Sequence, residues 1–214
     1  MKFCRILIVT IALLLVFSAC GKTNGEGDAA EPATTQEATG ATNELTVVFN
    51  DQEDYGPGAF ELKKALAFIS GMRYNAVSTA KHAYVAFANY DVQLGLYTVD
   101  LPKEPGQIVI VVSFKTENLE VPFEQQMEAY AKMAVPTGTY EPAWMGEGKC
   151  FQVHYFVGGQ EGGPSISGEG ASGTATLTTS TPDKLAGTID FTSAKGSTIK
   201  GTFNVKVEKD LWKN

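Results

Sequence analysis

The stretch "KLAGTIDFTSAKGSTIKGTFNVKV", residues 184–207, alternates apolar or small side chains with polar ones on both sides of the segment "SAKGS". Period two is the repeat of a β-strand with one buried and one solvated face, and a glycine-containing connection is typical of a hairpin. The preceding run "GTATLTTS", residues 173–180, predicts a third strand, so this end of the chain should form an antiparallel meander. The positions predicted to face inward in the hairpin are Leu185, Gly187, Ile189, Phe191, Ile199, Gly201, Phe203, Val205 and Val207.

Earlier in the chain, short runs rich in Val, Ile, Tyr and Phe are separated by turn signals such as "YGPG" and "LPKEPG", which extends the same pattern. The run "QIVIVVSF" is apolar on both faces and is therefore predicted to be a central, covered strand. The segment "FELKKALAFI", residues 60–69, fits a strand or a helix, and we predict a strand. The other predicted strands are "LTVVF" (45–49), "AYVAFANY" (83–90), "VQLGLYTV" (92–99) and "CFQVHYFV" (150–157).

One segment has helical rather than alternating periodicity. In "PFEQQMEAYAKMAV", Pro122 suits a first helical turn, Glu124 lies in that turn and Lys132 lies near the end. Its apolar side chains share one face, which is typical of a helix lying on a sheet. The sequence therefore predicts an all-β fold, an antiparallel two-sheet sandwich with one short covering helix at about residues 122–134, in a single domain over residues 45–214.

The N-terminus has the organisation of a signal peptide, predicted over residues 1–19. Lys2 and Arg5 precede an apolar run from Ile6 to Phe17, in which Thr10 is the one polar residue. A spanning helix needs about 20 apolar residues, so this run is too short to cross a bilayer.

Residues 17–21, "FSACG", follow directly and place a cysteine at the end of the apolar run. Here the chain resembles the bacterial lipoproteins, although Phe17 stands where that family more often has leucine. The resemblance implies that Cys20 becomes the first mature residue and carries a diacylglycerol and often an N-acyl chain, which would hold the protein to the cell membrane or outer membrane on its extracytoplasmic side. Residues 21–44 contain no large apolar residue and are predicted to be a disordered acidic tether.

Charge and cysteine content exclude some classes of protein. Removing Lys2 and Arg5 from the 17 basic residues leaves 15 against 24 acidic ones, a charge of −9, which disfavours binding to nucleic acid. Cys4 is removed with the signal peptide and Cys20 is acylated, so Cys150 is the remaining thiol and no intramolecular disulfide is expected. Since Cys150 opens an apolar run, we interpret it as a buried, inert side chain.

Three short motifs match catalytic or nucleotide-binding patterns by composition. The segment "GEGASG", residues 168–173, has dinucleotide-loop spacing, but a predicted strand follows it where that chemistry requires a helix. "STAK" (78–81) and "STIK" (197–200) have the form S-x-x-K without the companion motifs of penicillin-recognising enzymes. His82 and His154 lie apart without metal-ligand spacing. We interpret the glycine motif as a flexible loop, the two S-x-x-K matches as coincidence and the histidines as two isolated imidazoles.

An acidic cluster, Asp51, Glu53 and Asp54, is the best metal candidate. Its EF-hand register fails, because Tyr55 occupies the fifth position and Leu62 the twelfth, where a bidentate glutamate is needed. A loose calcium site remains open, and no metal or cofactor is predicted.

Trp144 is the candidate ligand-binding residue. It lies in "YEPAWMGEGKC", a turn-rich segment before a predicted strand, where an exposed indole would stack on a sugar or peptide and a buried one would close the end of the core.

The leading functional hypothesis is a non-catalytic binding or structural module of the cell envelope whose ligand is unknown, with a glycan or a protein of the envelope as the candidate partners. One alternative is a carboxylate-based envelope hydrolase, for which Glu147, Glu161 and Glu169 are candidates, and another is a lipocalin-like carrier of an apolar ligand.

Overall fold

The computed structural model describes residues 43–50, 59–73, 78–95, 98–116, 119–125, 128–129, 134–143, 149–159 and 166–210. The chain divides into two units, Met1–Glu37 and Ala38–Asn214, and all described residues lie in the second. The elements of this unit in chain order are β1 (Glu44–Val48), β2 (Lys64–Arg73), β3 (Ser78–Ala88), β4 (Ile108–Lys115), β5 (Leu119–Glu120), the 3-10 helix η1 (Phe123–Gln125), β6 (Gly138–Pro142), β7 (Cys150–Val157), β8 (Ser172–Ser180), β9 (Lys184–Thr192) and β10 (Thr198–Asp210).

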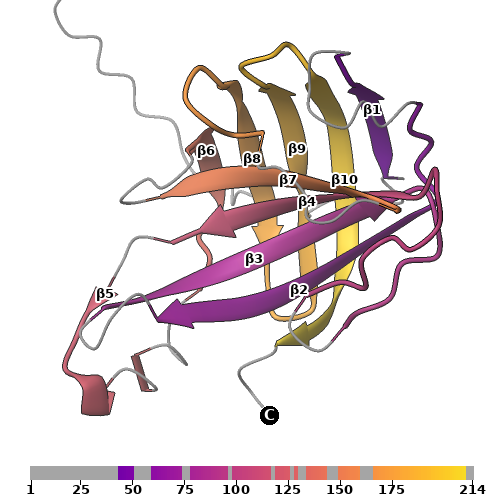
Figure 1. Cartoon of the computed structure of the whole chain (residues 1–214). Helices are drawn as coiled ribbons and strands as arrows, with labels where there is room; N and C mark the ends of the chain where they lie inside the picture. Colours follow the sequence, from indigo (N-terminus) through magenta and orange to yellow (C-terminus); the bar gives the residue numbers. More distant parts are fainter. Residues whose placement is uncertain are drawn as a thin grey trace, which may run out of the picture. The chain divides into compact units, whose positions relative to one another are not determined.

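Eight of these strands form a closed β-barrel, in the order β10, β2, β3, β4, β7, β6, β8, β9 and back to β10 (Figure 1). The short strand β1 pairs with the outer edge of β10, and β5 pairs with the start of β3. The predicted open two-sheet sandwich is therefore wrong, although the prediction of a β-rich fold is correct.

Strands β10 and β6 close the barrel, because each pairs with one neighbouring strand along its first part and with a different strand along its last part. Residues 198–206 of β10 run antiparallel to β9, and Val207, Lys209 and Asp210 run parallel to β2, with an irregularity between Val207 and Lys209. Similarly, Gly138–Tyr140 of β6 pair with β8, and Glu141 and Pro142 pair with β7. Closure leaves fewer unpaired edges than an open sandwich would expose, although β1 pairs with β10 alone among the described strands.

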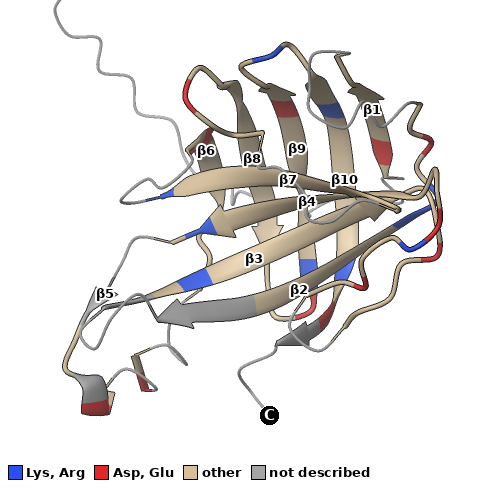
Figure 2. Cartoon of the chain, in the orientation of Figure 1, with Lys and Arg blue, Asp and Glu red and all other residues tan. Residues whose placement is uncertain are grey.

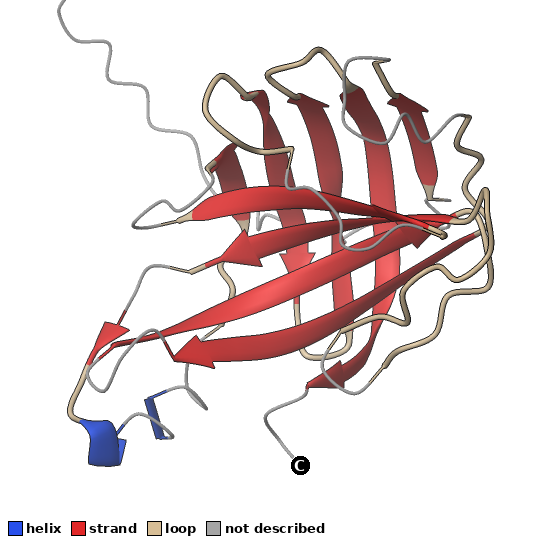
Figure 3. Ribbon diagram, in the orientation of Figure 1, coloured by secondary structure: helices blue, strands red, loops and turns tan. Residues whose placement is uncertain are grey.

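The predicted covering helix at about 122–134 is also wrong. In the described part of this segment, helical structure is limited to the 3-10 turn η1, which follows β5 at the end of the barrel where β3 begins, and to residues 128–129 (Figure 3). A barrel buries its apolar face against itself, so its interior needs no helix for cover.

The outer face of β2, β3 and β4 is covered instead by the loop that follows β3. The sequence predicted a strand over residues 92–99, but its described residues form a single bridge between Leu94 and Val99, and the Gly95 N–H donates to the Thr98 carbonyl oxygen at 2.7 Å. Strand β4 is consequently buried at every residue, as predicted for a covered strand. This outer cluster contains Leu66, Phe68, Ala86, Ala88, Val92, Val99, Val109 and Val111.

The C-terminal meander is confirmed with its register. Strands β8, β9 and β10 are sequential antiparallel neighbours, and Phe203 pairs with Gly187. The larger side chains predicted to face inward are all buried. The opposite face is polar, as the ion pair between Lys200 and Asp190 at 3.0 Å illustrates, and Figure 2 shows charged positions on β1, β9 and β10. The segment 60–69 contains the start of β2, so the choice of strand over helix was correct.

Aromatic rings from strands that are not neighbours meet inside the barrel. Phe203 of β10 contacts Phe87 of β3 and Phe114 of β4, with ring centroids 6.1 and 6.0 Å apart. Phe151 of β7 contacts Phe191 of β9 at 5.9 Å. Contacts between such separated strands require the rings to cross the interior, so side chains fill the barrel at this level.

Gly187 provides the space that the Phe203 ring occupies. A β-carbon at Gly187 would overlap the carbonyl oxygen of Thr176 and lie 2.9 Å from Cζ of Phe203. Gly187→Ala is therefore expected to lower the free energy of unfolding by about 1 to 3 kcal/mol through overpacking. Urea denaturation can measure this against Thr188→Ala, a change on the exposed face of the same strand. Equal midpoints for the two variants would show that β9 can shift without cost.

Candidate ligand-binding site at the barrel end

The candidate site is built on the segment Ala59–Lys63, which leads into β2. Phe60 and Leu62 are half-buried and pack against the barrel core, whereas Glu61 and Lys63 are exposed. The backbone N–H of Lys63 donates to the carbonyl oxygen of Ala88 at 2.8 Å, so the segment continues the pairing of β2 with β3. This alternation turns two apolar side chains inward and a carboxylate and an ammonium group outward.

Asn89 fixes the other wall of the site. Its Nδ2 donates to the carbonyl oxygen of Gly106 at 2.8 Å, and its Oδ1 accepts a hydrogen bond from the backbone N–H of Ile108 at 2.7 Å. The end of β3 and the start of β4 are thereby held together by one side chain. Because both bonds use groups on the Asn89 carboxamide, its position is set by the fold and not by a ligand.

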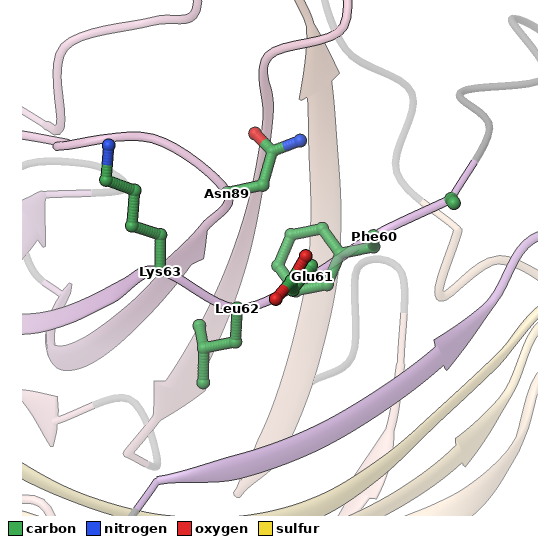
Figure 4. A pocket seen from close by; sticks show the side chains of 6 residues that line it. Phe60, Glu61, Leu62, Lys63 and Asn89 are labelled. Carbon is green, nitrogen blue, oxygen red and sulfur yellow. The ribbon is translucent and has the colours of Figure 1, made fainter.

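A pocket of about 500 Å³ lies between these groups (Figure 4). This volume falls within the range of small-molecule sites, about 300 to 1,000 Å³. In the part of the chain that the structure describes, the pocket lining combines apolar, amide and charged residues. It is lined by Ala59, Phe60, Glu61, Leu62, Lys63 and Asn89.

Residues next to the described pocket lining make two further polar contacts. Nζ of Lys64 lies 2.9 Å from Oδ1 of Asp91, and this hydrogen bond is the main cause of the lowered pKa of Asp91. The phenol of Tyr90 donates to the carbonyl oxygen of Asp100 at 2.7 Å, and burial together with the Asp100 carboxylate raises the pKa of Tyr90 to about 12. Tyr90 therefore stays protonated at physiological pH.

A second group of buried side chains lies on the outer face of the barrel, near the start of β3, whereas the pocket lies near its end. The group consists of His82, Lys115 and Cys150. His82 is 3% exposed and pairs in register with Lys115 of β4, which in turn pairs with Cys150 of β7. Nε2 of His82 has no hydrogen-bond partner among the described residues. Burial, reinforced by the Lys115 charge, lowers the pKa of His82 to about 4. Burial raises the pKa of the Cys150 thiol, which supports its interpretation as inert.

Most of the candidates named from the sequence lie outside the described residues. These are Cys20, Trp144, Glu147, Glu161 and the acidic cluster of Asp51, Glu53 and Asp54. Glu169 is described and exposed on a turn. Among the described residues, no group of three or more His, Cys, Asp or Glu side chains is placed to hold a metal ion.

The two histidines and the glycine-rich motif occupy structural positions. His82 lies on β3 and His154 on β7, and burial lowers the pKa of His154 as well. The motif at residues 168–173 leads into strand β8, so the helix that a dinucleotide loop requires does not follow it. Of the S-x-x-K matches, "STAK" lies within β3, and Oγ of Ser197 accepts a hydrogen bond from the Asn50 backbone.

Sequence reasoning missed the pocket at Ala59–Lys63. The alternation of Phe60 and Leu62 with charged residues was visible, but it was assigned wholly to a strand. Nothing in the sequence alone showed that Asn89 would lie opposite this segment.

Comparison with known protein families, curated proteins and solved structures finds no match to this chain. Fold and site geometry thus define its class, an eight-stranded closed β-barrel with a mixed apolar and polar pocket. Among the described residues, no helix has the length and apolar character needed to span a bilayer.

Proposed function

We propose that this protein is a lipid-anchored, extracytoplasmic binding module, in which a filled β-barrel serves as a rigid scaffold. The observation that supports the filled scaffold is the packing of Phe87, Phe114, Phe151, Phe191 and Phe203 across the interior. A scaffold of this kind presents a ligand at its ends and loops, where binding residues concentrate.

The anchor rests on the sequence. The apolar run, the small residues Ser18 and Ala19, and Cys20 follow the order of a lipoprotein signal, and multiple acyl chains would hold the barrel stably at a bilayer.

A lipocalin-like carrier is the second candidate, because a closed eight-stranded barrel is compatible with that function. Barrels of eight strands either fill with side chains or hold one small ligand, and the ring contacts favour the first arrangement here. Mass spectrometry of natively purified protein separates the two. If one apolar molecule is extracted for each protein molecule, the carrier function is supported instead.

Cys20→Ser should abolish incorporation of labelled fatty acid and either release the protein from the membrane or leave an uncleaved precursor. Cys150→Ser is the matched control, because Cys150 is buried in β7 and the resemblance gives it no lipid. Labelling in cells followed by membrane fractionation measures both effects. If Cys20→Ser still incorporates the label and fractionates like the unaltered protein, the anchor is placed at the wrong residue.

A further inference from the structure

We propose that His82, Lys115 and Cys150 form a pH-sensitive switch on the outer face of the barrel, in which protonation of His82 opens this part of the face and makes the Cys150 thiol accessible. The three residues occupy one row across β3, β4 and β7, because His82 pairs with Lys115 and Lys115 pairs with Cys150. The switch goes beyond the proposed binding function, and it does not require the lipid anchor.

The row lies on one side of the sheet, outside the barrel. The His82 ring stacks on Tyr84, and the Tyr84 ring stacks on Phe68 of the outer apolar cluster, with ring centroids 5.7 and 4.6 Å apart. Directly paired residues of neighbouring antiparallel strands point to the same face, so Lys115 and Cys150 share this face with His82. The charge of Lys115 acts on both of its neighbours in the row, which places the three side chains close together.

His82 is held in this row as a neutral ring. It is buried, and its Nε2 has no hydrogen-bond partner among the described residues. Burial, reinforced by the charge of Lys115, lowers the pKa of His82 to about 4. A proton bound by this ring would put a second cation beside Lys115 in a site closed to water. The protonated ring therefore favours an arrangement in which it reaches solvent.

The charged group in register with His82 is a cation, and no described anion faces it directly. The groups nearest to His82 in register on the described strands are Tyr84 on β3, Lys115 on β4, Cys150 on β7, Ser70 on β2 and, four residues away along β3, the pair of Ser78 with Glu120 on β5. Lys115 therefore opposes protonation of His82 as long as the face is closed.

The direction of the switch follows from the two pKa values of His82. In the closed state the pKa is about 4, and once the ring reaches water it returns to the usual 6.5. The closed state is fully favoured above pH 6.5, and opening becomes more favourable as the pH falls towards 4. Between pH 7 and pH 4.5 these values predict a rise of roughly 50-fold in the equilibrium constant for opening. Local opening breaks fewer contacts than unfolding of the barrel, so it precedes unfolding.

The accessibility of Cys150 measures the opening. A pyridyl disulfide reagent is added to the full chain in detergent micelles, and its rate of reaction with Cys150 is divided at each pH by its rate with glutathione. We expect this relative rate to rise roughly 50-fold from pH 7 to pH 4.5, while the far-UV circular dichroism of the barrel stays unchanged. Cys150→Ser gives the background from Cys4 and Cys20.

His82→Phe should abolish the rise, because the phenyl ring binds no proton. His154→Phe, which removes the other histidine and lies on β7 with Cys150, is the matched control and should retain it. A relative rate that does not change with pH would overturn the proposal. An equal rise in His82→Phe, or a rise that appears only together with loss of the circular dichroism signal, would overturn it as well.

The coupling should also act in reverse, which needs no substitution. Two sites that share one opening equilibrium affect each other by the same factor, so modification of Cys150 should move the pKa of His82 from about 4 towards 6.5. NMR titration of the His82 ring before and after modification measures this shift. An unchanged pKa after complete modification would show that the two residues do not belong to one switch.

Discussion

Phe203→Ala is expected to lower the free energy of unfolding by about 3 to 5 kcal/mol, the cost of removing a buried phenylalanine and leaving a cavity. Phe203 is 3% exposed, and its ring contacts the rings of Phe87 on β3 and Phe114 on β4. In the strand order, β2 lies between β10 and these two strands. Its loss would break the contact that joins the β9–β10 hairpin to β3 and β4. Urea or guanidinium denaturation followed by circular dichroism measures the change.

Asn204→Ala is the matched control for this substitution. Asn204 lies one residue further along β10 on the opposite face, and its backbone N–H, which donates to Oδ1 of Asn43 at 2.8 Å, is retained in the variant. A change within about 0.5 kcal/mol is expected for such a site. Similar denaturation midpoints for the two variants would mean that the register of β10 is misplaced or that the ring contacts do not stabilise the fold.

The C-terminal hairpin could be predicted because local chemistry determines it. Alternation from Leu185 to Phe191 and from Ile199 to Val207 fixes which face is buried, and a shift by one residue would expose all of these side chains. The same reasoning identified β4, whose apolar residues on both faces require cover on both sides. The buried positions of the hairpin agree with the prediction, and β4 lies one residue further along the chain than the predicted run 107–114.

Barrel closure could not be predicted in this way. A strand in a sandwich and a strand in a barrel have the same alternation, and the difference lies in whether β10 pairs with both β9 and β2. Closure depends on the irregularity between Val207 and Lys209 and on contacts between residues far apart in the chain. The candidate site was missed for a related reason, since Asn89 and Phe60 meet only after β2 and β3 have paired.

Acidification from pH 6.5 to pH 4 is expected to reduce stability by up to about 3 kcal/mol through His82 alone. Burial and the Lys115 charge lower the folded-state pKa of His82 from 6.5 to about 4. The unfolded chain therefore binds a proton at a higher pH than the folded chain does. The stabilisation is fully present above pH 6.5 and is lost as the pH falls towards 4, at about 1.4 kcal/mol for each unit of pKa difference.

His82→Phe should remove this pH dependence and leave the fold intact. A phenyl ring suits the outer face, where Tyr84 stacks on Phe68 with ring centroids 4.6 Å apart, and it eliminates a buried Nε2 that lacks a partner among the described residues. His154→Phe is the control for the other histidine on this face, and it should retain the His82 contribution. Denaturation at pH 7 and pH 4.5 measures both variants, and NMR titration of the His82 ring locates its pKa directly. If His82→Phe and the unaltered protein lose the same stability between these pH values, or the ring titrates near 6.5, His82 is solvated and the outer face of β3 is not closed over it.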